Sequence, residues 1–121
     1  MEEWEIDFHF LKVRHYIKDK LGVKELPDMR SILFLVGVQE LGSGPRSFSK
    51  EEKQDLMHIA ACTLLEEDGY YDFKGRDEDG WPHWSIGIPF KTKGVKEQEH
   101  LLKSKIISYF KEAFPDNDKT N

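Results

Sequence analysis

Apolar residues recur at helical spacing over the first part of the chain. At about 100° per residue, one narrow arc between positions 3 and 21 collects Ile6, Phe10, Val13, Ile17 and Leu21. A second stripe lies on the opposite side and consists of Trp4, Phe8, Leu11 and His15. The pattern predicts a helix over 3–21 that ends at Gly22, with its second stripe covered by a hairpin or by another subunit.

The run SILFLVGVQELG, residues 31–42, has apolar side chains at every angle around a helix axis. Short apolar runs also suit a buried strand, so both alternatives stay open, although the helix formers at 39–41 and Gly42 favour a helix. We expect that helix to begin near Pro27 and Asp28 and to be buried on all sides. Gly37 would cost about 1 kcal/mol relative to alanine there, unless another backbone passes close by.

Two further helices and a hairpin are predicted in the second half of the chain. Ser49 and Glu52 form a capping box, which predicts a helix from there to about Asp68. Aromatic and β-branched residues over 70–90 flank the turn-like GRDEDG and predict a two-stranded hairpin, and periodicity over 96–114 predicts a last helix. The expected fold is mainly α (α+β): four helices with a β-hairpin inserted before the last one, in the order α-α-α-β-β-α.

The composition bounds the class of protein. The chain has 121 residues, of which 38% are hydrophobic and 34% charged, values typical of a globular chain. We expect a single globular domain over 1–115 and a disordered polar tail over 116–121. No apolar run approaches the roughly 20 residues of a membrane span, and the acidic start MEEWEIDFHF is unlike a secretory signal, so a cytoplasmic protein with no membrane partner is expected.

Charge and cysteine content exclude further classes. The net charge of −5 gives no overall attraction to phosphate backbones, so no nucleic-acid partner is expected. The one cysteine, Cys62, cannot form an internal disulfide or a multi-cysteine zinc site. No cofactor is expected.

Three groups of residues are candidates for chemistry. His58 and Cys62 stand four positions apart on the third predicted helix, a spacing at which two side chains can reach one metal ion, but the other ligands of known zinc motifs are missing and no metal is expected. Asp77, Glu78 and Asp79 resemble the opening of a calcium loop, but Pro82 stands where such a loop needs glycine, which favours a hairpin turn.

The third group is the aromatic cluster Trp81-Pro82-His83-Trp84. Large aromatic residues beside carboxylates and an imidazole fit three roles: filling the core, anchoring a protein interface, or lining a small-molecule site. Alternation along a strand predicts Trp81 and His83 on one face and Trp84 on the other.

Three stretches, ILFLVGVQELGSG, FSKEEKQDLMHIA with the following GYY, and DGWPHW, resemble a family of small uncharacterised proteins from Bacteroidetes bacteria. The resemblance covers nearly the whole chain and implies a bacterial protein, but no activity and no catalytic residues.

Two functions are consistent with these patterns. The first is a non-enzymatic protein-interaction module that forms a homodimer or binds a protein partner, with an interface containing Trp4, Phe8, Leu11, Trp81, His83 and Trp84. The alternative is a metal-dependent or acid/base enzyme that uses His58, His83, Asp77 and Asp79, which requires these residues to share a concave site.

Overall fold

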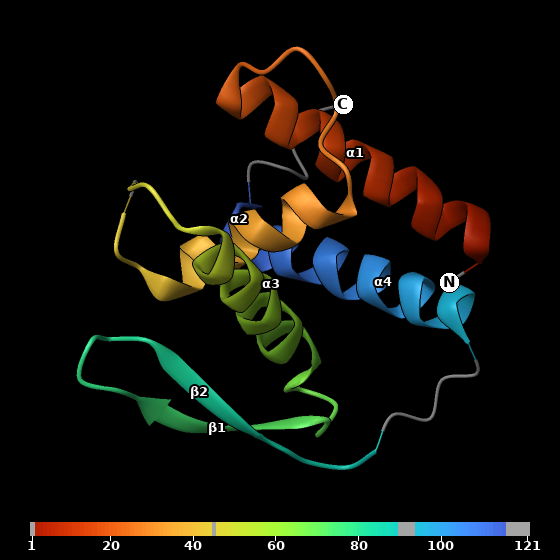
Figure 1. Ribbon diagram of the computed structural model, residues 1–121. Coiled ribbons are helices and arrows are strands. Elements are labelled where there is room, and N and C mark those ends of the chain that lie inside the picture. Colours follow the sequence, from red (N-terminus) through yellow and green to blue (C-terminus); the bar gives the residue numbers. More distant parts are fainter. Residues whose placement is uncertain (1, 45, 90–93, 116–121) are drawn as a thin grey trace. The chain divides into compact units, whose positions relative to one another are not determined.

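The computed structural model describes residues 2–44, 46–89 and 94–115 (Figure 1). The elements are α1 (Glu3–Leu21), α2 (Met29–Leu41), α3 (Lys50–Leu65), β1 (Tyr71–Arg76), β2 (Pro82–Ile86) and α4 (Val95–Ala113). The predicted order α-α-α-β-β-α is confirmed, and the apolar run at 31–41 is helical. The predicted polar tail, 116–121, lies outside the described residues.

The described residues fall into two compact units. The α1–α4 unit contains residues 2–28 and 94–115, and the hairpin unit contains α2, α3 and the two strands, residues 29–44 and 46–89. One domain over 1–115 stays a prediction.

The α1–α4 unit pairs the first helix with the last, and the two run parallel (Figure 1). In their first turns Lys96 Nζ lies 3.8 Å from Glu3 Oε1. Near their ends the rings of Tyr16 and Phe114 are 6.1 Å apart. The predicted inner arc of α1 is buried at Ile6, Phe10, Val13 and Ile17. Leu21 was predicted in the same arc, but it is exposed because it occupies the last position of the helix.

In the hairpin unit, α2 and α3 cross at Gly37. A Cβ built on Gly37 would overlap the carbonyl oxygen of Leu56 and would lie 2.6 Å from its carbonyl carbon. From the sequence we expect another backbone to pass close to Gly37, and the backbone of Leu56 does so. Around this crossing Leu41, Leu56 and Ile59 form a buried cluster.

Burial of α2 on all sides, as predicted from its composition, is wrong. Ile32, Val36, Gly37 and Leu41 are buried, but Gln39 is exposed and the remaining apolar residues between them are half-buried. Partial burial suffices because large apolar side chains tolerate some contact with water at the rim of a small core.

Helix α3 begins as predicted. The Ser49 hydroxyl accepts a hydrogen bond from the Glu52 amide, and the Glu52 carboxylate accepts one from the Ser49 amide. The hydrogen bond from the Ser49 amide is the main reason that the pKa of Glu52 is lowered. The helix ends at Leu65, three residues before the predicted Asp68.

The hairpin pairs β1 and β2 in antiparallel register, with Phe73 opposite Trp84 and Gly75 opposite His83. The register shifts between Phe73 and Gly75, so that Lys74 is an extra residue on β1. Gly75 has φ of +113°, a conformation open to glycine but strained for other residues. The glycine therefore allows β1 to carry the bulge just before the acidic turn.

Candidate functional site

Asp77 organises the turn between the two strands. Its Oδ1 accepts hydrogen bonds from the amides of Asp79 at 2.9 Å and Trp81 at 3.0 Å. Its Oδ2 lies 2.8 Å from His83 Nε2. The hydrogen bond with His83, and next that with the Trp81 amide, hold the pKa of Asp77 below its usual value. The acidic residues 77–79 therefore lie in a hairpin turn that the Asp77 side chain stabilises. A hairpin turn is what the sequence analysis favoured over a calcium loop.

The lowered pKa of Asp77 predicts that the hairpin weakens in acid. A carboxyl whose pKa is lower in the folded state stabilises the fold above its unfolded pKa of about 4, and this stabilisation is lost as the pH falls through the folded pKa. The thermal midpoint of the wild type should thus drop more between pH 6 and pH 3 than that of Asp77→Asn, as measured by circular dichroism. Asp79→Asn serves as the control and should behave like the wild type. Equal drops in wild type and Asp77→Asn would contradict this role.

Both tryptophans of the cluster lie on the same side of the hairpin. Trp81 and Trp84 are half-buried and pack against the cluster of Leu41, Leu56 and Ile59. The prediction that they point to opposite faces is wrong because β2 begins only at Pro82, so strand alternation does not apply to Trp81. His83 lies on the exposed face.

Arg76 joins the hairpin to the end of α2. Its guanidinium donates to the carbonyl oxygens of Glu40 at 2.7 Å, Leu41 at 3.1 Å and Gly80 at 2.7 Å. The last carbonyls of a helix have no partner inside the helix and carry partial negative charge. Arg76 therefore caps the end of α2, although it follows Leu41 by 35 positions in the sequence.

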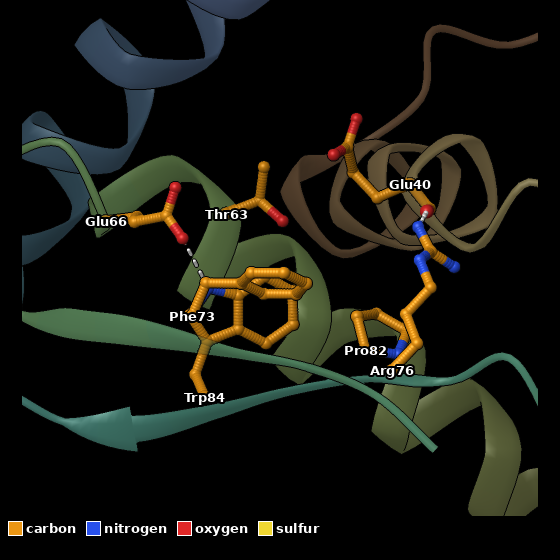
Figure 2. A pocket seen from close by; sticks show the side chains of 7 residues that line it. All are labelled: Glu40, Thr63, Glu66, Phe73, Arg76, Pro82 and Trp84. Carbon is orange, nitrogen blue, oxygen red and sulfur yellow. Dashed lines mark hydrogen bonds between the residues drawn. The ribbon is translucent and has the colours of Figure 1, made fainter. Parts of the chain in front are cut away.

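A pocket of about 220 Å³ opens between this cap and α3 (Figure 2). It is lined by Glu40, Thr63, Glu66, Phe73, Arg76, Pro82 and Trp84. At one end the Trp84 indole Nε1 donates to Glu66 Oε1 at 2.9 Å, and the ring centroids of Phe73 and Trp84 are 5.3 Å apart. Glu40 and Arg76 lie at the other end (Figure 2). Among the described residues, Thr63 Oγ1 is a buried side-chain oxygen without a hydrogen-bond partner.

His58 and Cys62, the weak metal candidates, lie together on α3 with 3.5 Å between His58 Nε2 and Cys62 Sγ. The His58 ring also meets the Tyr71 ring edge-on, at 6.0 Å between centroids. Burial, and secondly the charge of Glu66, raise the pKa of the Cys62 thiol to about 11. The thiol is thus a protonated core group at neutral pH. Within residues 2–44, 46–89 and 94–115, no three His, Cys, Asp or Glu side chains are placed to hold a metal ion.

The candidate acid/base residues do not share one site. His58 contacts Tyr71 at the start of β1, whereas His83 pairs with Gly75. Tyr71 and Gly75 are separated by roughly 13 Å at the usual rise of a strand. The structure therefore brings His83 together with Asp77 but places His58 at the other end of the hairpin.

The outer face of α1 comprises Trp4, Phe8, Leu11 and His15, and all four are exposed. The exposed fractions of Trp4, Phe8 and Leu11 are 69%, 55% and 41%. Such a group of large apolar side chains on one face is typical of an interaction surface.

Fold and site together define a small α+β protein of four helices with an aromatic hairpin. No protein-family model, curated protein or solved structure matches the chain. The resemblance to the Bacteroidetes family stays a prediction. Within the described part of the chain, no helix has the length and apolar character that crossing a membrane requires.

Sequence reasoning missed the residues that complete the pocket. Glu66 and Thr63 belong to no motif, and Arg76 was interpreted only as part of the turn-like GRDEDG. The partners of Arg76 and Glu66 are distant along the chain, as with the 18 positions between Glu66 and Trp84. The sequence signal that pointed to this region was the aromatic cluster at 81–84 beside carboxylates and the imidazole of His83.

Proposed function

We propose that the protein is a non-enzymatic interaction module that self-associates through the outer face of α1. The observation that carries the proposal is the exposure of Trp4 at 69%, Phe8 at 55% and Leu11 at 41% along a single helix face. A tryptophan left in water at the surface of a small protein is a strong candidate for an interface anchor.

The spacing of the outer face suits a second copy of the same helix. Trp4, Phe8, Leu11 and His15 follow each other at intervals of four, three and four, which is the alternation of a and d positions in a coiled coil. In an antiparallel pair related by a two-fold axis, Trp4 of one copy faces His15 of the other, and Phe8 faces Leu11. The face is therefore complementary to itself.

The charges along α1 favour the same antiparallel arrangement. Its first turn carries Glu3 and Glu5, and its last turn carries Lys18 and Lys20. Two antiparallel copies place the acidic end of one beside the basic end of the other, whereas parallel copies bring like charges together. Because the apolar face is small, we expect a weak dimer with a Kd of roughly 10 to 100 µM.

The double variant Trp4→Ala, Phe8→Ala tests this proposal. It removes the two largest anchors, so we expect it to remain monomeric in light scattering at concentrations where the wild type has begun to dimerise. The control is Ile86→Ala with Val95→Ala, which removes two exposed apolar side chains outside α1 and should leave the dimer intact. A wild type that stays monomeric at high micromolar concentration, or a control that dissociates equally, would refute the interface.

The enzyme alternative has narrower support. Its single favourable observation is the 2.8 Å contact of His83 with Asp77, a pair in which a carboxylate orients an imidazole. The same carboxylate also holds two amides of the turn, so this contact is accounted for by the folding of the hairpin. His58, which the enzyme would need beside it, lies at the other end of β1.

A further inference from the structure

The pocket of the hairpin unit contains an aromatic corner, defined by the side chains of Phe73 and Trp84. The two residues are opposite each other on β1 and β2, and their ring planes meet at 63° with centroids 5.3 Å apart. Trp84 is fixed by packing against the buried cluster of the hairpin unit, whereas Phe73 is 50% exposed. The corner therefore has two aromatic walls, one held by the core and one open to solvent.

A carboxylate stands beside the aromatic corner. Glu66 Oε1 accepts the hydrogen bond of the Trp84 indole at 2.9 Å, which holds the acidic group against the edge of that ring (Figure 2). A neutral N–H donor leaves the carboxylate charge uncompensated. Phe73 and Trp84 are in edge-to-face contact, so a cation beside them would meet an open aromatic face together with this charge, and the two attractions reinforce each other.

The positive charge of Arg76 lies away from the aromatic corner. Its guanidinium donates to three backbone carbonyls, two of them at the end of α2, at the opposite end of the pocket from Glu66 (Figure 2). The net charge of the chain, −5, also favours a cationic partner over an anionic one.

The size and shape of the pocket restrict the cation. Its volume of about 220 Å³ is below the roughly 300 to 1,000 Å³ of most small-molecule sites, so it suits one side chain of a larger partner. A planar guanidinium needs a wide free ring face to stack on, whereas a compact ammonium group needs less free surface beside two rings in edge contact. Lysine fits this corner better than arginine.

We propose that the aromatic corner binds the ammonium group of a lysine side chain from a partner protein, with Glu66 as its counter-ion. This site lies on the hairpin unit and is separate from the self-association face of α1. It gives the interaction module a second surface with a defined chemical preference.

Titration of the ¹⁵N-labelled protein with acetyl-Gly-Lys-Gly-amide tests the proposal. We expect the indole Nε1–H signal of Trp84, assigned by its loss in Trp84→Phe, to shift with a Kd on the order of 1 mM. The same peptide with norleucine in place of lysine lacks the charge and should cause less than a tenth of the shift. Arginine in that position should bind more weakly than lysine. No shift with lysine, an equal shift with norleucine, or tighter binding of arginine would each overturn the proposal.

Glu66→Gln tests the role of the carboxylate charge without disturbing the fold. The glutamine carbonyl can still accept the Trp84 indole hydrogen bond, so the spectrum should remain that of a folded protein while lysine affinity falls at least fivefold. Glu51→Gln removes the same charge at an exposed site on α3 and should bind like the wild type. Unchanged affinity in Glu66→Gln would overturn the role of the counter-ion. The Trp4→Ala, Phe8→Ala variant should bind the peptide normally, so failure of self-association and failure of lysine binding are distinguishable.

Discussion

Gly37→Ala is expected to lower the free energy of unfolding by about 2 to 4 kcal/mol. The added Cβ would overlap the carbonyl oxygen of Leu56 and lie 2.6 Å from its carbonyl carbon. These are backbone atoms inside α3, so the two helices would have to move apart to make room. At an unobstructed helix position the same change would stabilise by about 1 kcal/mol, which makes the sign of the effect diagnostic.

Urea denaturation followed by circular dichroism measures this effect. Gln39→Ala lies on the exposed side of the same helix and should change the free energy of unfolding by about 0.5 kcal/mol at most. If Gly37→Ala were instead more stable than the wild type, α2 and α3 would not cross at this residue.

Arg76→Met should cost about 2 kcal/mol of stability, because it removes three charged hydrogen bonds to backbone carbonyls while keeping most of the aliphatic stem. The end of α2 would lose its cap, and the hairpin would lose its polar link to that helix. Arg76→Lys should restore less than half of the loss, since one ammonium group cannot reproduce the planar fork.

The urea midpoints of the two Arg76 variants are compared with that of Lys74→Met. Lys74 is the neighbouring exposed cation on β1, so this control removes the same charge without touching α2. If Lys74→Met lowered the urea midpoint as much as Arg76→Met does, the loss of stability would come from removing a positive charge from β1 and not from removing the cap of α2.

Local features of the fold were predictable because they depend on residues close in sequence. The capping box of Ser49 and Glu52, the inner arc of α1 and the acidic turn each follow from side chains a few positions apart. Gly37 was informative as well, since an otherwise costly glycine inside a helix predicted the close backbone that Leu56 provides.

Contacts between distant segments were not predictable in the same way. The parallel pairing of α1 with α4 joins the two ends of the described chain, and amphipathic periodicity carries no information about which helix covers which. The same holds for the site, where Arg76 meets Glu40 and Leu41, and Trp84 meets Glu66. Alternation misplaced Trp81 because the pattern does not show where a strand begins.

Antiparallel self-association through the outer face of α1 can be measured directly with a spin label at Asp19→Cys. The native Cys62 is buried with a pKa of about 11, so the label attaches to the introduced thiol. One copy carries the spin label and no ¹⁵N, and the other carries ¹⁵N and no spin label. In a mixture of the two, each at about 0.2 mM, most chains should be dimeric for the expected Kd. The amide signals of Glu3 and Trp4 in the ¹⁵N copy should then broaden. Undiminished signals at those residues would contradict self-association through this face.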